Sequence, residues 1–145
     1  MNSMLHEKSE ANLEIAMVCL SKQKESFYSV GASRAYYAIF QETKNFLVKN
    51  SFDYKLFKRN DSIAINQADY AHGSIRSALE YFLRTNGFNS KDDLIFIMRV
   101  RSTFYKLYNW RIEGDYNETV ITKENLEDAI ESAEKFINGL KKYNN

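Results

Sequence analysis

The sequence contains no proline and only five glycines among its 145 residues. Because these residues form most tight turns, their scarcity argues against a fold with many short strands. The apolar residues recur mostly at spacings of three and four, which is the period of an amphipathic helix. These features predict an all-α protein, an up-and-down bundle of about five helices. A chain of this length suits one hydrophobic core, so residues 1–145 are predicted to form a single domain.

The ends of several helices are marked by local signals. Ser90 is followed by acidic residues in a capping-box pattern, and Gly114 is predicted to end the same helix, because glycine accepts the left-handed conformation of a helix C-cap. The helical period fails over residues 51–72, which predicts a long connection before a helix that begins near Gly73 or Ser74. The expected helices span residues 9–22, 25–50, 73–85, 90–114 and 122–142.

Apolar faces are visible on three of these helices. The second helix carries apolar residues on more than one side, so we expect it to be buried on more than one face. Its main stripe consists of Ala32, Ala35, Tyr36, Ile39, Thr43, Phe46 and Leu47. The first helix is predicted to bury Leu13, Ala16, Met17 and Leu20, and the fourth Leu94, Ile97, Met98, Phe104, Tyr105 and Tyr108. Arg76 and Glu80 are expected to form an exposed ion pair one turn apart.

Charge is unevenly distributed along the chain. The net charge is only +1, so no strong overall field draws nucleic acid or a membrane. Residues 51–111 carry ten Lys and Arg against six Asp and Glu, whereas residues 112–145 carry four against eight. An anion-binding surface is therefore expected from the middle of the chain, unless these charges only solvate helix faces. The candidates are Arg99, Arg101, Lys106 and Arg111.

Composition also indicates the cellular compartment in which we expect the protein. Cys19 is the one cysteine, which excludes an internal disulfide, and its apolar neighbours predict a buried structural thiol. The N-terminus lacks a basic segment followed by an apolar run, and no stretch approaches about 18 uninterrupted apolar residues. We expect a cytoplasmic protein with no membrane partner.

The residues needed for metal or triad chemistry are missing. A ferritin-like metal site requires Glu-x-x-His on two helices, and neither of the two histidines has Glu three positions before it. The sequence contains no GxxxxGK[ST], GxGxxG or GxSxG motif. We therefore expect no metal and no cofactor, and nucleophilic hydrolysis has no candidate triad.

Residues 104–116, FYKLYNWRIEGDY, combine a dense aromatic segment with a single arginine. Arg111 is predicted to lie in the last turn of the fourth helix, with Asp115 and Tyr116 just beyond it. In one interpretation Arg111 stabilises the helix end and pairs with Asp115 or Glu113. In the other, its fixed fork of donors binds a phosphate of RNA or of a nucleotide.

Four further residues are candidates for binding RNA or a nucleotide. Arg34 and Tyr37 are predicted to project between the apolar sides of the second helix, where Arg34 should find a carboxylate or line a cleft. His72 is placed just before the third helix, where the positive helix end favours a neutral imidazole that makes a local hydrogen bond. Arg101 belongs to the basic middle of the chain.

Three motifs resemble a known family. Residues 33–40, SRAYYAIF, resemble the second-helix signature SRAYYAxF of the HEPN superfamily, in its branch of short stand-alone prokaryotic proteins. Residues 70–73, YAHG, and residues 111–116, RIEGDY, are similar to later signatures of the same branch, in which the last is commonly RxxADY. The matches follow the family order, and the resemblance covers nearly the whole chain.

The resemblance implies a helical bundle that forms a homodimer, in which the fourth-helix motifs of two subunits face each other across a composite cleft. Many HEPN proteins are metal-independent endoribonucleases that act as toxins or in phage defence. In them an arginine, followed four to six residues later by histidine, stabilises phosphate charge while the imidazole transfers a proton. On this basis Arg111, Asp115 and Tyr116 are the candidate catalytic residues.

The chain departs from that pattern at one position. Tyr116 stands five residues after Arg111, and no histidine follows His72. A tyrosine with a pKa of about 10 is a poor base at neutral pH. The resemblance therefore also suggests a non-catalytic partner of a nucleotidyltransferase antitoxin, which binds nucleotide or receives AMP on Tyr116. A purely structural dimer module is the third hypothesis.

Overall fold

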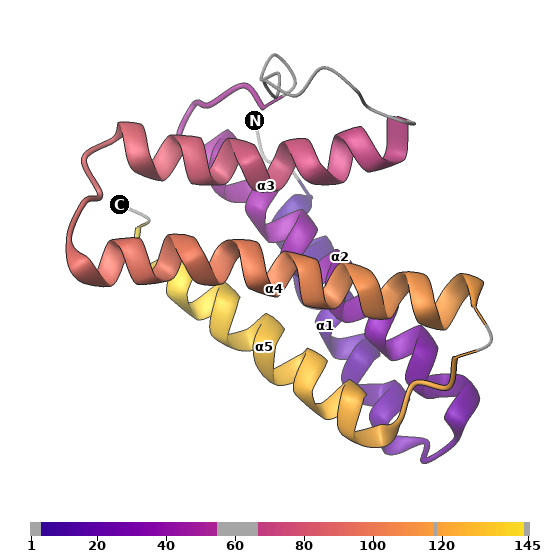
Figure 1. Cartoon of the computed structure of the whole chain (residues 1–145). Coiled ribbons are helices and arrows are strands. Elements are labelled where there is room, and N and C mark those ends of the chain that lie inside the picture. Colours follow the sequence, from indigo (N-terminus) through magenta and orange to yellow (C-terminus); the bar gives the residue numbers. More distant parts are fainter. Residues whose placement is uncertain (1–3, 55–66, 118, 144–145) are drawn as a thin grey trace.

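The computed structural model describes residues 4–54, 67–117 and 119–143, and the side chains of all of these except residues 67–74. These residues form five α-helices and no strand, which confirms the all-α prediction. The helices are α1 (Leu5–Ser21), α2 (Glu25–Lys49), α3 (Gln67–Thr85), α4 (Lys91–Tyr116) and α5 (Lys123–Lys141) (Figure 1). None of the helices in the described part combines the length and apolar character that a membrane span requires.

Helix α2 is the centre of the bundle. It contacts each of the other four helices, and its buried residues extend from Tyr28 to Leu47, so the predicted burial on more than one face is confirmed. Gly31 allows α2 to approach two neighbours closely, because a Cβ atom there would lie 2.8 Å from the Leu126 side chain of α5 and 3.0 Å from Cys19 of α1. Cys19 is buried as predicted.

Capping boxes begin the last two helices. The Ser90 hydroxyl accepts a hydrogen bond from the backbone N–H of Asp93, and the Asp93 carboxylate accepts one from the backbone of Ser90. Thr122 and Asn125 make the same reciprocal pair at the start of α5. Each pair satisfies two backbone donors that the first helical turn would otherwise leave unpaired. The predicted start of the fourth helix is therefore confirmed.

The predicted end of the fourth helix is wrong, because α4 continues through Gly114 to Tyr116. Gly114 is needed for close packing rather than for a C-cap. A Cβ atom on Gly114 would lie 2.9 Å from Cβ of Ser29 and 3.1 Å from Ile121. The missing side chain lets the end of α4 approach α2 and the start of α5. Consequently Asp115 and Tyr116 are helical and stay at helical spacing from Arg111.

Two helices also begin earlier than predicted. Helix α3 starts at Gln67, so the segment YAHG lies inside the helix and not before it. Polar residues can extend a helix because propagation adds one hydrogen bond per residue to an existing nucleus. Of the predicted connection 51–72, residues 55–66 lie outside the described part. Helix α1 starts at Leu5, and the hydroxyl of buried Ser9 donates to the Ala38 carbonyl of α2 at 2.8 Å.

Some predicted burial is wrong. Met98 and Tyr105 of α4 are each 71% exposed, and Met17 of α1 is 43% exposed. Helix α4 buries Ile97 and Phe104 as predicted and also Val100 and Leu107, because these four lie on the side facing α2 and α5. The pair Arg76–Glu80, expected on the surface, is largely buried, and Arg101 of α4 approaches Glu80 at 3.1 Å. A buried carboxylate requires such partners to offset its loss of hydration.

A histidine and a buried carboxylate link α1 to α2. Nδ1 of His6 lies 3.1 Å from Oε2 of Glu42, whose side chain is only 6% exposed, and Glu10 contacts the other ring nitrogen. The hydrogen bond with Glu42 raises the pKa of His6 above its usual value of 6.5. Folding therefore favours the protonated imidazole.

Because the pKa of His6 is raised in the fold, its contribution to stability is present below pH 6.5 and is lost as the pH rises through the raised value. We expect His6→Ala to lower the free energy of unfolding more at about pH 5 than at about pH 8.5, measured by urea denaturation. The same substitution in a Glu42→Gln background should show much less pH dependence. An equal loss at both pH values in both backgrounds would contradict this assignment.

Candidate functional site

Arg111 lies near the end of α4, inside a group of tyrosine rings. Its side chain is only 13% exposed. The guanidinium carbon lies 5.2 Å from the ring centroid of Tyr37 and 5.9 Å from that of Tyr36, both on α2. It lies 5.8 Å from the ring of Tyr116, on α4 itself. The cation is thus placed against three π-systems at distances typical of cation–π attraction.

Helical spacing explains why these residues meet. Ser33, Tyr36 and Tyr37 lie three and four residues apart, so they share the face of α2 that is directed at the end of α4. On α4, Arg111 and Asp115 are also one turn apart. The Ser33 hydroxyl donates to Oδ2 of Asp115 at 3.2 Å, which fixes the two helices against each other at this point. We call Ser33, Tyr36, Tyr37, Arg111, Asp115 and Tyr116 the Arg111 cluster.

The guanidinium is only loosely paired. Oδ2 of Asp115 is 4.0 Å from Nε of Arg111, which is beyond hydrogen-bond distance. Nε is buried and has no hydrogen-bond partner among the described residues. Nearly all buried polar groups in proteins are hydrogen-bonded, so an unpaired donor on a charged group calls for an explanation. Among the described residues no other buried side-chain nitrogen or oxygen lacks a partner, which sets Arg111 apart.

The tyrosines differ in their surroundings. Tyr36 is fully buried, and this burial raises the pKa of its phenol although the positive charge of Arg111 opposes the shift. Its hydroxyl therefore stays protonated at neutral pH and is not a base. Tyr116 is 67% exposed and Asp115 is also on the surface. The cluster thus has a buried, neutral aromatic side and a solvent-accessible polar side.

The structure separates the remaining candidates from this cluster. Arg34 is exposed and donates to Oδ1 of Asn12 on α1 at 3.3 Å, so it lies on another side of α2. Arg101 pairs with Glu80 of α3 and lies ten residues, or about 15 Å along the helix, from Arg111. His72 is in α3, but its side chain lies outside the described residues. Of the four predicted binding residues, Tyr37 alone is shown beside Arg111.

Sequence reasoning identified Arg111, Asp115, Tyr116 and Tyr37 but not two of their neighbours. Ser33 and Tyr36 were assigned to a motif and to the apolar stripe of the second helix. Their spacing from Tyr37 was the available signal, because residues three and four apart share a helix face. Nothing in the sequence showed that this face would meet the end of α4.

No metal-binding site is found among the described residues. They contain no group of three or more His, Cys, Asp or Glu side chains placed to hold a metal ion. Lys106, another candidate from the basic middle of the chain, is engaged by Asp128 at 2.9 Å and by the Ser132 hydroxyl at 2.7 Å.

The sequence matches no protein-family model and no curated protein. The resemblance to HEPN proteins therefore depends on the three motifs and is consistent with the all-helical fold.

Replacing Arg111 with methionine tests whether the arginine is a structural clamp. The variant loses cation–π contacts of about 0.5–2 kcal/mol, but it also removes a buried unpaired donor that costs about 1–3 kcal/mol. We expect the free energy of unfolding to change by less than about 1 kcal/mol, measured by urea denaturation. As a reference, Leu107→Ala, one turn earlier and fully buried, should lose about 2–5 kcal/mol. A loss of about 3 kcal/mol or more for Arg111→Met would assign a structural role.

Proposed function

We propose that this protein is a HEPN-like RNA-binding protein and that Arg111 binds the phosphodiester backbone. The observation that carries the proposal is the buried guanidinium whose Nε has no hydrogen-bond partner among the described residues. An arginine is always charged and its donors match two phosphate oxygens at once. Aromatic walls keep the local dielectric low, which strengthens the attraction to an anion.

A ligand would reach Arg111 from the exposed side of the cluster. Asp115 is held by Ser33 rather than by a short contact with Arg111, so the guanidinium can accept a phosphate without first breaking a hydrogen bond to this carboxylate. Tyr116 is exposed beside it and offers a ring for stacking on an unpaired base. Single-stranded RNA, with accessible bases and backbone, fits this arrangement better than a duplex.

The same cluster supports metal-independent cleavage of RNA. The Asp115 carboxylate can take the proton of a ribose 2′-hydroxyl, whose oxygen then attacks the adjacent phosphorus as the 5′-oxygen leaves. Arg111 would stabilise the negative charge that develops on the phosphate oxygens, and the phenol of Tyr116 can supply a proton to the leaving oxygen. In this scheme a tyrosine acts as the acid, so no basic phenol is required.

An exposed apolar stripe on α4 supports the proposed homodimer. Leu94, Met98, Tyr105 and Tyr116 lie four, seven and eleven residues apart in sequence, which places them on one face of the helix. Their exposed fractions are 44%, 71%, 71% and 67%. Because this stripe ends beside Arg111, pairing of two α4 helices along it would bring two Arg111 clusters toward a shared cleft.

RNA binding and cleavage can be tested directly. The purified protein is expected to bind single-stranded RNA and to cleave it in the presence of EDTA. Arg111→Ala should abolish cleavage and weaken binding by about tenfold or more, since a hydrogen bond to a charged group contributes about 1.5–3 kcal/mol. Arg84→Ala, which removes an exposed arginine of α3 that has no ion-pair partner among the described residues, is the control and should retain both activities. Absence of both binding and cleavage by the unmodified protein would overturn the proposal.

The exposure of Tyr116 favours a second candidate function, that of a non-catalytic partner of a nucleotidyltransferase. In this reaction the phenol oxygen of Tyr116 attacks the α-phosphate of ATP, pyrophosphate leaves and AMP becomes attached to the ring oxygen. Arg111, 5.8 Å from the ring, would then stabilise the new phosphodiester.

This modification has a clear signature. With ATP and a nucleotidyltransferase from the same operon, mass spectrometry should find one AMP on Tyr116. The modification should be lost in Tyr116→Phe and kept in Tyr105→Phe, because Tyr105 is equally exposed on the same helix. AMP on any other residue, or none at all, would exclude this candidate.

A further inference from the structure

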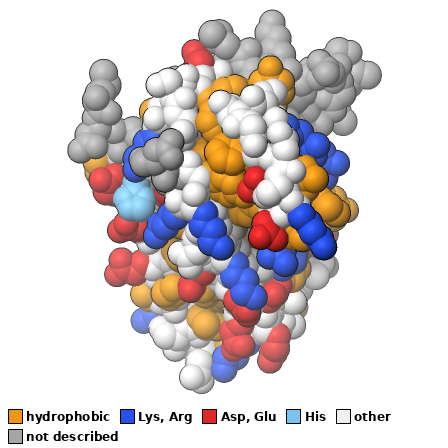
Figure 2. All heavy atoms as spheres, turned by 90° about the vertical axis from the view of Figure 1, so that its left-hand side faces the viewer, with side chains coloured by type: hydrophobic (Ala, Val, Ile, Leu, Met, Phe, Trp, Pro, Cys, Tyr) orange, Lys and Arg blue, Asp and Glu red, His pale blue; other side chains and the backbone are white. Residues whose placement is uncertain are grey.

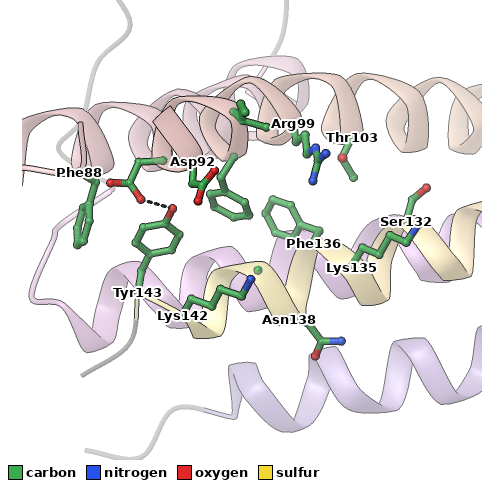
Figure 3. Close-up of a pocket in the computed structure, with 14 residues that line it drawn as sticks. Phe88, Asp92, Arg99, Thr103, Ser132, Lys135, Phe136, Asn138, Lys142 and Tyr143 are labelled. Carbon is green, nitrogen blue, oxygen red and sulfur yellow. Dashed lines mark hydrogen bonds between the residues drawn. The ribbon is translucent and has the colours of Figure 1, made fainter. Parts of the chain in front are cut away.

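A groove of about 1070 Å³ lies between the first half of α4 and the second half of α5 (Figure 3). It is lined by residues from Phe88 to Thr103 and from Ser132 to Tyr143, and by no residue of the Arg111 cluster. The groove and the Arg111 cluster therefore occupy opposite ends of α4. Neither the sequence motifs nor the proposed binding of RNA at Arg111 explains this groove.

Aromatic rings form the middle of the groove. Phe96 of α4 and Phe136 of α5 stack with their centroids 6.1 Å apart and their planes at 27°. Gly139 makes this arrangement possible, because a Cβ atom there would lie 2.6 Å from the Phe96 ring. Phe96 remains partly exposed, so a ligand can contact an apolar ring in the groove.

Tyr143 fixes one end of the groove. Its hydroxyl donates to Oδ1 of Asp93 at 2.8 Å, and its ring packs edge-on against Phe88 at 4.8 Å (Figure 3). Burial and the Asp93 carboxylate raise the pKa of Tyr143 to about 12, so the hydroxyl remains a donor at neutral pH. Asp93 also caps α4, so its carboxylate accepts hydrogen bonds both from Tyr143 and from the backbone of Ser90.

Charges are distributed unevenly along the groove. Arg99 extends from α4 and Lys135 lies on α5 across from it, whereas Asp92 and Lys142 lie toward the end occupied by Tyr143 (Figure 3). Arg99 is exposed, and among the described residues it has no ion-pair partner, while Lys135 pairs with Glu131 on the outer surface at 2.8 Å. Figure 2, which views the molecule from the side of the α3–α4 connection, shows basic side chains gathered beside hydrophobic ones.

The dimensions of the groove favour an elongated ligand. Its volume lies at the upper end of the range of about 300–1,000 Å³ that is typical of small-molecule pockets. The lining residues of α4 run from Asp92 to Thr103, a length of about 16 Å at 1.5 Å per residue. This length accommodates about five residues of an extended peptide.

The charge pattern of the groove favours a peptide ligand over a nucleic acid. At the Tyr143 end Asp92 lies near Lys142, so the groove offers no continuous row of cations to a polyanionic backbone. A peptide can instead place one carboxylate between Arg99 and Lys135, a hydrophobic side chain on Phe96, and an uncharged or basic residue beside Asp92. Each part of such a ligand meets a complementary group.

We propose that the groove between α4 and α5 binds an acidic linear segment of a partner protein. A carboxylate of the segment pairs with Arg99 and Lys135, and a large hydrophobic residue next to it packs on Phe96 and Tyr143. Such a segment combines an anion and an apolar anchor at the spacing that the groove offers. The site is independent of RNA binding at Arg111.

Selection from a library of random heptapeptides on the full-length protein tests this inference. Enriched peptides should share an acidic residue beside a large hydrophobic one, and their affinity is measured by fluorescence anisotropy. The double variant Arg99→Glu, Lys135→Glu should weaken binding by about tenfold or more. A peptide with Lys in place of the acidic residue should regain affinity for this variant. Both substitutions are on the surface, and an unchanged circular dichroism melting curve will confirm that the variant folds.

Matched variants define the site. Lys141→Glu changes the same charge on an exposed lysine that does not line the groove, so it should leave peptide affinity unchanged. Arg111→Ala should also leave it unchanged, which separates this site from the proposed RNA site. The inference is overturned if no peptides are enriched, if enriched peptides lack acidic residues, or if Lys141→Glu weakens binding as much as the double variant. Displacement of the peptide by an oligouridylate, lost in the double variant, would instead assign the groove to RNA.

Discussion

Burial of α2 among four other helices is the constraint on which the rest of the structure depends. Gly31 brings α2 so close to α1 and α5 that even a methyl group would collide with Leu126. Because α2 contacts four other helices, rotation about its axis would open cavities, each of which costs stability in proportion to its volume. The face carrying Ser33, Tyr36 and Tyr37 is therefore held in place. Packing of the core thus sets the geometry of the Arg111 cluster.

The two ends of α4 are specialised in different ways. At its C-terminal end, Gly114 allows close contact with α2, and a single cation lies among tyrosines with an unpaired Nε. At its N-terminal end, the capping box of Ser90 and Asp93 also holds Tyr143, and so fixes one wall of the α4–α5 groove. The first arrangement suits one phosphate, whereas the second suits a ligand with mixed charge. The length of α4 thus separates the two sites for which we propose different ligands.

Ion pairs in this protein differ in what they contribute. The His6–Glu42 and Arg101–Glu80 contacts neutralise carboxylates that the helix packing has buried, so they offset a desolvation cost. Arg111 is different, because its nearest carboxylate stays at 4.0 Å and is held by a serine instead. A buried guanidinium whose Nε lacks a hydrogen-bond partner is better suited to binding an anion than to stabilising the fold. This contrast is the physical basis for the proposal that Arg111 has a functional role.

The sequence by itself determined the fold class, the capped start of the fourth helix and the identity of the residues at the end of α4. Apolar spacing, capping boxes and the absence of proline are local signals, and each acts within a few residues. Local signals misplaced the end of α4, because Gly114 serves a contact with Ser29 that is distant in sequence. Only the tertiary structure decided that Tyr36 and Ser33 lie beside Arg111, whereas Arg34 and Arg101 do not. It also decided that a groove lies beside Phe96. These features depend on which helix faces meet, and that is set by packing of the whole core rather than by any one segment.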